Sequence, residues 1–333
     1  MRVLVVNVSK GYYNLGVNKL RDYMAAQGHD VTCHDGDPGL FAQGFNLVCL
    51  SVIFSWHAPI ARDIALRVKG DSDVWCGGPG IFALASWWKK VTGLECQRGL
   101  DARFDKQRGS YRMTFASRGC PVNCSFCVVP RIESTTFTLD WDFCPTPILC
   151  DNNLSALPVD FQEHILSRYG ETHTRLVDAN SGFEPLTFDE GTYRRWKPIL
   201  RGPWRFAFDT THESPQVERM MSVLKEESPR RKRVYVLIGN EPIAQCYERA
   251  QKVIEWGGEP CVQPMIPLNA LRRDDLKIAY DWDFQKLKDF QRYYYRYLWR
   301  SDIPIWEYSN RQGESPTIQK IHLALNSEKC RQY

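Results

Sequence analysis

Three cysteines stand at the spacing C-x3-C-x2-C, as Cys120, Cys124 and Cys127. Thiolates at this spacing on one tight loop can converge on a single iron–sulfur cluster. Three ligands on a four-iron cluster leave one iron open for a substrate or cofactor. Gly119 lets the loop bend sharply, and Phe126, just before the third cysteine, can shield a cluster from water. The stretch therefore predicts a metal centre.

A zinc site is the alternative interpretation of the same cysteines. Structural zinc is usually held by four Cys or His ligands, and Cys144 or Cys150 could supply the fourth. The chain would then be a zinc-stabilised binding protein without catalysis. The sequence leaves both interpretations open. They differ in the metal that the purified protein would carry.

The stretch from Ala116 to Arg131 resembles the signature of the radical S-adenosylmethionine (SAM) enzymes. The resemblance implies a [4Fe–4S] cluster on the three cysteines, whose open iron chelates the amino and carboxylate groups of SAM. One electron, from an external donor such as a flavodoxin or ferredoxin, then cleaves SAM to methionine and a 5′-deoxyadenosyl radical. That radical abstracts a hydrogen from an unactivated C–H bond of a substrate that the sequence does not name.

Length and composition set broader bounds. A chain of 333 residues has room for two domains, and 43% hydrophobic with 25% charged residues is typical of a globular protein. Twelve cysteines in so long a chain do not look like a disulfide framework. No apolar run reaches the roughly 20 residues of a membrane span, and the N-terminal stretch lacks a signal-peptide cleavage site. We expect a cytoplasmic protein without membrane contact.

The first 92 residues predict a Rossmann-like domain. Apolar strand patterns alternate there with helical spacing, which favours a doubly wound parallel sheet. The expected strands are 2–7, 31–33, 46–52 and 73–76, and the expected helices are 15–26 and 58–69.

This pattern resembles the cobalamin-binding domain that precedes the radical domain in one large subgroup of radical SAM enzymes. Ser51-Val52-Ile53 and Gly77-Gly78 fall where that domain has its ligand-loop motifs. The resemblance implies cobalamin as a cofactor and methyl transfer as the outcome. However, the loop of residues 7–13 lacks the D-x-H-x-x-G motif that supplies a cobalt-ligating histidine. A domain that is vestigial, or that serves as a substrate-binding lid, is the alternative. His57 could approach the ligand face, although a lone histidine is more often structural.

A second domain is expected after a polar linker at 93–110. Residues 111–267 alternate strand and helix patterns in about six β/α units, which fits the partial (β/α)6 barrel of radical SAM enzymes, and 268–333 form a C-terminal helical extension. The predicted fold class is therefore α/β: a Rossmann-like doubly wound parallel sheet, a partial barrel and a helical segment. The barrel strands are expected at 111–116, 146–151, 175–179, 204–208, 233–238 and 259–263.

Polar residues follow the predicted barrel strands, where β/α barrels place their chemistry. By resemblance, Asp151, Asn152 and Asn153 hold the SAM ammonium group, and Gly239, Asn240 and Glu241 lie near the SAM ribose. Other polar residues at strand ends are Asp178, Asn180 and Asp209. Ordinary helix capping is the alternative role for each, because Asp and Asn favour such positions.

Aromatic and basic residues alternate in a predicted helix at 282–300. Rings between arginines can stack bases and pair phosphates, and a net charge of +4 permits a nucleic-acid partner without requiring one. A cobalamin-independent radical SAM enzyme acting on a nucleic acid or another large substrate is therefore a rival. Packing of the aromatic face on the barrel is the structural alternative. A methylthiotransferase is disfavoured, because its further cysteine motifs are not evident in the N-terminal domain.

Overall fold

The computed structural model describes residues 1–301, 303–310 and 314–319. These residues form two compact units. Unit 1 comprises residues 1–146 and 267–275, and unit 2 comprises residues 147–266 together with the described residues after 275. This division by packing does not test the four segments predicted from the sequence, which stay predictions.

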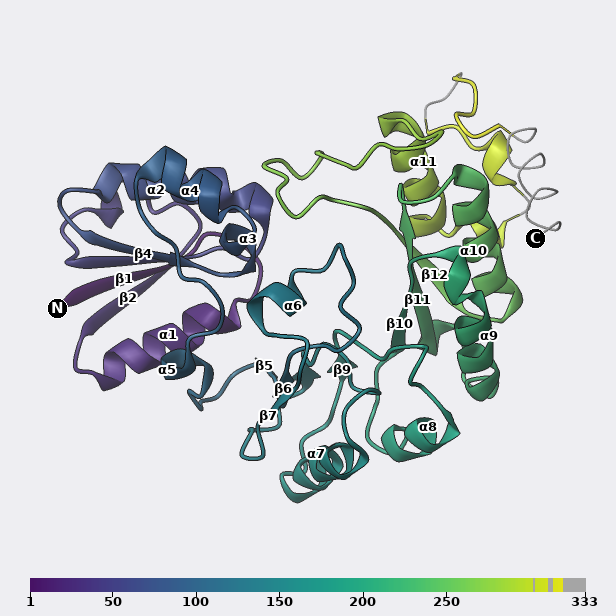
Figure 1. The fold of residues 1–333 in the computed structure, drawn as a ribbon, viewed down its shortest axis with the longest axis horizontal. Coiled ribbons are helices and arrows are strands. Elements are labelled where there is room, and N and C mark those ends of the chain that lie inside the picture. The colour runs from purple at the N-terminus through teal and green to yellow at the C-terminus, as the bar shows by residue number, and fades with distance from the viewer. Residues whose placement is uncertain (302, 311–313, 320–333) are drawn as a thin grey trace. The chain divides into compact units, whose positions relative to one another are not determined.

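Unit 1 begins with a four-stranded parallel sheet (Figure 1), as the strand patterns predict. Its strands are β1 (Arg2–Asn7), β2 (Asp30–Asp35), β3 (Leu47–Ser51) and β4 (Asp73–Gly77), in the order β2-β1-β3-β4. In the register, Val5 of β1 stands opposite both Cys33 of β2 and Cys49 of β3. Val3 to Val6 are fully buried, because helices cover both faces of a doubly wound sheet.

Helices lie on the two faces of this sheet (Figure 1). Val17 and Met24 of α1 (Leu15–Ala26) pack with Val3 and Val5 of β1 on one face. The opposite face is covered by α2 (Ala58–Val68) and α4 (Ala85–Thr92), whose Ile64 and Trp88 are buried with Leu4 and Val6. The strand period of two therefore sends alternate residues of β1 into two separate cores.

Shorter elements complete unit 1. The single-turn helices are η1 (Gly39–Ala42), η2 (Ser55–His57), α3 (Pro79–Phe82), α5 (Ala102–Asp105) and α6 (Val129–Ile132). β5 (Met113–Thr114) lies inside the strand predicted at 111–116, and β6 (Ser117–Arg118) pairs antiparallel with β7 (Thr138–Leu139). The cysteine loop follows β6 directly.

Unit 2 alternates strands and helices, as the sequence predicts. β8 (Ile148–Leu149) pairs parallel with β9 (Asp178–Ala179), and β10 (Trp204–Phe208), β11 (Lys232–Ile238) and β12 (Glu259–Pro264) form a second parallel ladder. The helices are α7 (Val159–Glu171), α8 (Glu190–Trp196), α9 (Ser214–Val223) and α10 (Ile243–Glu255), with η3 (Thr211–Glu213) and η4 (Pro229–Arg231) between them.

β8 and β9 are much shorter than the strands predicted at 146–151 and 175–179. The backbone N–H groups of Val177 and Asp178 both donate to the carbonyl of Pro147, at 2.8 and 3.1 Å. One carbonyl with two donors interrupts the regular ladder, and proline itself brings no N–H. The parallel arrangement is confirmed, whereas closure into a partial six-unit barrel stays a prediction.

The C-terminal part of unit 2 contains α11 (Phe284–Tyr295), η5 (Leu298–Arg300) and η6 (Ile305–Glu307). Leu287, Phe290 and Tyr294 of α11 are buried, so the aromatic face of this helix packs into the unit. The last predicted residues, 320–333, lie outside the described part of the chain. In the ranges described, no helix combines the length and apolarity needed to cross a membrane.

Candidate functional site

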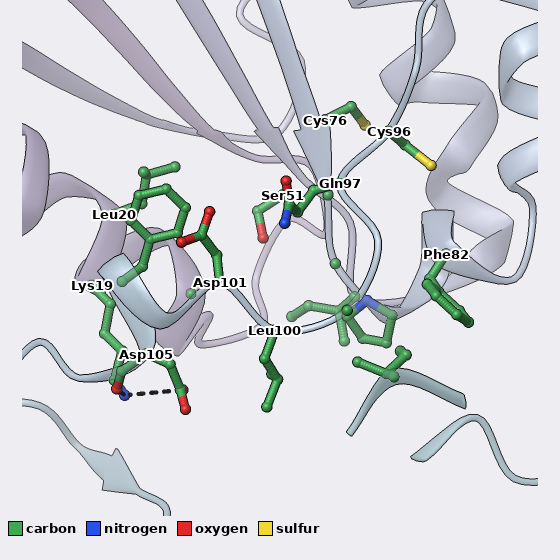
Figure 2. A pocket seen from close by; sticks show the side chains of 18 of the residues that line it. Lys19, Leu20, Ser51, Cys76, Phe82, Cys96, Gln97, Leu100, Asp101 and Asp105 are labelled. Carbon is green, nitrogen blue, oxygen red and sulfur yellow. Dashed lines mark hydrogen bonds and ion pairs between the residues drawn. The ribbon is translucent and has the colours of Figure 1, made fainter. Parts of the chain in front are cut away.

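A cavity of about 690 Å³ lies within unit 1 at the carboxyl ends of β3 and β4 (Figure 2). Ser51, Gly77 and Gly78, which the sequence proposes for a ligand loop, all line it. Sheet order reverses between β1 and β3, and ligands of open α/β sheets bind at this switch point outside the strand ends. The volume is within the range of small-molecule and cofactor sites.

Gly78 shapes the floor of this cavity. Its φ is +103°, and a Cβ built there would lie 2.4 Å from the carbonyl oxygen of Val52. The close approach is part of the sheet end, because Val52 N–H donates to the carbonyl of Gly77 at 2.9 Å. Any larger side chain would have to push β4 away from the end of β3. Only glycine allows both this positive φ and this close approach to the Val52 carbonyl.

A buried amide network holds Ser51. Asn14 Nδ2 donates to Ser51 Oγ at 3.0 Å and to Asn7 Oδ1 at 3.1 Å, while its Oδ1 caps α1 by accepting from Val17 N–H at 3.2 Å. Asn7 Nδ2 in turn donates to Asp35 Oδ1 at 2.7 Å. Asn14 also lines the cavity. Sequence reasoning missed Asn14, although an Asn just before a helical pattern is a recognisable cap signal.

The predicted linker forms one wall of the cavity. Gln97 N–H donates to the carbonyl of Cys76 at 2.7 Å, which continues the edge of the sheet beyond β4. Leu100 and Asp101 lie along the same wall (Figure 2). The polar composition of this stretch resembles a tether, so its contribution could not be read from the sequence. It supplies Glu95, Cys96, Gln97, Gly99, Leu100, Asp101, Arg103, Phe104 and Asp105.

The described residues that line the cavity include three cysteines and no histidine. Burial raises the pKa of Cys76 and Cys96, and it raises the pKa of Cys49 to about 12. These thiols therefore stay protonated at neutral pH. His57 does not line the cavity, and its Nδ1 lies 2.9 Å from Ser9 Oγ. Among the described residues, a cofactor bound in this cavity would therefore meet no protein imidazole.

The cysteine loop is tightly turned and partly exposed. Cys127 N–H donates to the carbonyl of Cys124 at 3.0 Å, and Asn123 has a φ of +55°. Cys120, Cys124 and Cys127 are each partly buried, as is Phe126. Three thiols on one turn are the donor set that an iron–sulfur cluster uses, so the residues fit the group. Among the described residues, no three or more Cys, His, Asp or Glu side chains lie close enough together to hold a metal ion, whether iron or zinc.

The residues after the third cysteine border the cavity. Val128, Val129 and Ile132, at and around α6, line it together with Phe115. The segment directly after Cys127 is thus part of the cavity wall within unit 1. The sequence treats the two as separate sites, because they come from the two predicted domains.

In unit 2, the predicted SAM residues Asp151 and Asn153 are buried, at 0% and 2% exposure. Asn153 Oδ1 accepts from Ala156 N–H at 3.1 Å, but its Nδ2 is buried and has no partner among the residues described. Asn152 is partly buried. An unsatisfied buried amide nitrogen is rare and is suited to an acceptor on a ligand.

Gly239, Asn240 and Glu241 follow β11, as predicted. Asn240 Nδ2 donates to the carbonyl of Asp209 at 2.5 Å, and its buried Oδ1 lacks a donor in the described ranges. Glu241 is used internally: its carboxylate accepts from Thr211 N–H at 3.0 Å and lies 3.0 Å from Arg249 Nε. That N–H is not aimed at the oxygen, so the pair is an electrostatic contact.

The other three residues predicted at strand ends, Asp178, Asn180 and Asp209, have different surroundings. Asp178 makes a two-pronged ion pair with Arg205, both contacts at 2.8 Å, and Asn180 is exposed. Burial raises the pKa of Asp209 to about 7; Glu213 adds to the rise, and Arg249 opposes it. A carboxyl group with a pKa near neutrality can take or give a proton.

Comparison with solved structures finds a likeness to TsrM, a radical S-adenosylmethionine methyltransferase from Kitasatospora setae, determined with cobalamin and a [4Fe–4S] cluster bound. The TM-score is 0.62 at 13% sequence identity, over 80% of this chain and 77% of that chain. The overall fold of the chain is therefore like that of TsrM. No family model matches the sequence, and no curated protein does. At this identity the likeness establishes the fold.

Proposed function

We propose that this protein is a radical SAM enzyme that modifies an unactivated C–H bond, with cobalamin-dependent methyl transfer as its reaction. The observation that carries the proposal is the C-x3-C-x2-C loop of residues 120–127 in a chain with this fold. The motif is a local feature of the sequence, whereas the fold likeness to TsrM extends over 80% of the chain at 13% identity.

Each group has residues suited to hold it. Cys120, Cys124 and Cys127 would ligate the cluster. In unit 2, Asn153 Nδ2 offers a buried donor and Asn240 Oδ1 a buried acceptor, neither with a partner among the residues described. SAM carries a carboxylate, which accepts hydrogen bonds, and ribose hydroxyls, which can donate them to Asn240. A partial barrel in unit 2 would account for the alternating strands. When bound, the cluster supplies the electron for reductive cleavage of SAM, and cobalamin supplies a methyl carrier.

Cobalamin is assigned to the cavity of unit 1. Ser51, Gly77 and Gly78, which the resemblance implies as ligand-loop residues, line this cavity, and Asn14 donates a hydrogen bond to the Ser51 hydroxyl. Because no histidine lines the cavity in the described part of the chain, cobalt would have no protein imidazole as a ligand. An external flavodoxin or ferredoxin as electron donor belongs to the same proposal.

Anaerobic purification, followed by reconstitution with iron and sulfide, tests the proposal. The native chain is compared with a variant in which Cys120, Cys124 and Cys127 are all changed to Ala. We expect the native protein to be brown and to contain about four irons, and the triple variant to lack both the colour and the iron. The native protein should also bind hydroxocobalamin. After one-electron reduction, the bound cobalamin should show no nitrogen hyperfine signal from a histidine ligand. Zinc without iron would establish the binding-protein alternative instead.

A nucleic-acid substrate is the second proposal, and Arg292, Arg296 and Arg300 are its basis. The helix predicted at 282–300 ends at Tyr295, so Arg292 lies in α11, Arg296 caps it and Arg300 lies in η5. In the structure these side chains have intramolecular neighbours: Arg300 lies 2.5 Å from Glu259 and over the Trp299 ring, and Arg292 lies 3.6 Å from Asp289. Binding of an oligonucleotide would have to compete with these pairs. Changing Arg292, Arg296 and Arg300 together to Gln would weaken oligonucleotide binding if the proposal is right, and unchanged binding would remove it.

A further inference from the structure

Four charged side chains in unit 1 form one continuous series, which we call the ion-pair chain: Lys19, Asp105, Arg118 and Glu133. Lys19 Nζ donates to the backbone carbonyl of Asp105 and lies 3.5 Å from its carboxylate (Figure 2). Arg118 Nη2 lies 2.5 Å from Asp105 Oδ1, and Arg118 Nη1 lies 3.2 Å from Glu133 Oε1. All four residues line the cavity, although they come from four separate segments.

The chain ends on the backbone of the cysteine loop. The second carboxylate oxygen of Glu133 accepts the N–H of Gly119 at 3.0 Å, directly before Cys120. Gly119 has a φ of +93°, and a Cβ there would lie 2.2 Å from the carbonyl oxygen of Thr136. Cys120 N–H donates to the carbonyl of Ser134 at 3.2 Å. The first cysteine is therefore held by a carboxylate and by the backbone of 134–136.

The ion-pair chain is largely buried. The side chains of Lys19, Arg118 and Glu133 are only 10%, 14% and 10% exposed, and that of Asp105 is 26% exposed. Burial lowers the pKa of Lys19 although Asp105 opposes it, while Arg118 and Lys19 hold the pKa of Asp105 low against the effect of its burial. Two cations and two anions balance, and removing one would leave a buried charge without compensation.

We propose that Arg118 and Glu133 are positioning residues that fix Gly119 and Cys120 relative to the wall of the cavity. Their role toward a cluster rests on the proposed function, while the anchoring of the loop does not. The guanidinium fork is needed, because separate Arg118 nitrogens contact the two carboxylates. A lysine at the same position would keep the charge and lose the fork.

Four variants test the role: Glu133→Ala, Glu133→Gln, Arg118→Lys and, as a control, Asp63→Asn in the exposed Arg62–Asp63 pair on α2. Backbone hydrogen exchange of residues 117–134 is measured first, in the protein without a cluster. We expect Glu133→Ala to speed exchange at Gly119 and Cys120 about tenfold or more, since opening free energies govern exchange. Glu133→Gln should keep slow exchange at Gly119, because its amide oxygen can still accept that N–H.

The second readout is the reduced cluster after reconstitution with iron and sulfide. Glu133→Ala and Arg118→Lys should shift its midpoint potential and electron paramagnetic resonance spectrum, whereas Asp63→Asn should match the native protein. Native exchange rates at Gly119 and Cys120 in Glu133→Ala would overturn the inference, as would an Arg118→Lys cluster indistinguishable from the native one. A native chain that takes up no iron would overturn the proposed function, and the exchange data would still decide how the loop is anchored.

Discussion

Charges are arranged differently in the two units. In unit 1 the ion-pair chain alternates two cations with two anions along the cavity wall. In unit 2, Asp209 is partly buried near Glu213 and Glu184, with Arg249 as the opposing cation, and its loss of solvent raises its pKa to about 7. Balanced buried charges hold a backbone in one place, whereas burial together with neighbouring carboxylates favours the protonated form of a carboxyl group. The charges of unit 1 therefore suit the positioning of Gly119 and Cys120, whereas unit 2 contains a carboxyl group, Asp209, that titrates near neutral pH.

The largest effect is expected at Arg249, the cation that opposes the raised pKa of Asp209. Its side chain is 0% exposed; it pairs with Glu241, and its Nη2 donates to the carbonyl of Leu237 at 2.7 Å. Changing Arg249 to Met should lower the free energy of unfolding by about 3–5 kcal/mol, because Glu241 would stay buried without its partner. Urea unfolding measures this. Lys252→Met, in a more exposed pair on the same helix, should lose less than about 1 kcal/mol, and equal losses would contradict the assignment.

Gly78→Ala tests whether the close contact between Gly78 and Val52 at the floor of the cavity contributes to stability. We expect a loss of about 2–4 kcal/mol, since the strained φ alone costs roughly 1–3 kcal/mol and the new Cβ would press on the Val52 carbonyl. Gly70→Ala is the matched control, because Gly70 has a φ of +110° with nothing near its Cβ position. Hydroxocobalamin binding should fall with Gly78→Ala and survive with Gly70→Ala. Equal unfolding curves for the two variants would show that the contact has no cost.

Asp209 gives the smallest effect and tests the unbalanced side of the comparison. Its pKa is raised in the folded protein, to about 7, so it favours the folded state at low pH, and that contribution is lost as the pH rises through about 7. From pH 5 to pH 8 the loss should be about 2.7 kcal/mol, because each of the two pH units below the pKa of about 7 contributes about 1.36 kcal/mol. Asp209→Asn should remove this part of the pH dependence of urea unfolding. A native slope in the variant would mean that another group titrates.

The secondary structure of this chain is largely local in origin. Residues 2–7 and 15–26 are a strand and a helix with the predicted bounds, because an apolar run and a helical period report burial directly. The cysteine motif is also local, since its spacing alone favours one loop. Strands β8 and β9 were predicted too long, because whether a carbonyl pairs regularly depends on the neighbouring strand.

The sequence by itself determined the parallel sheet of unit 1, the alternation in unit 2 and the three thiols. Tertiary structure decided which side chains meet. It turned the predicted linker of residues 93–110 into a cavity wall, placed Asn14 on Ser51, and joined Lys19 to Glu133 across 114 residues of chain through Asp105 and Arg118. Such contacts depend on long-range packing, and a pattern that extends over a few residues cannot encode the partner of a charge.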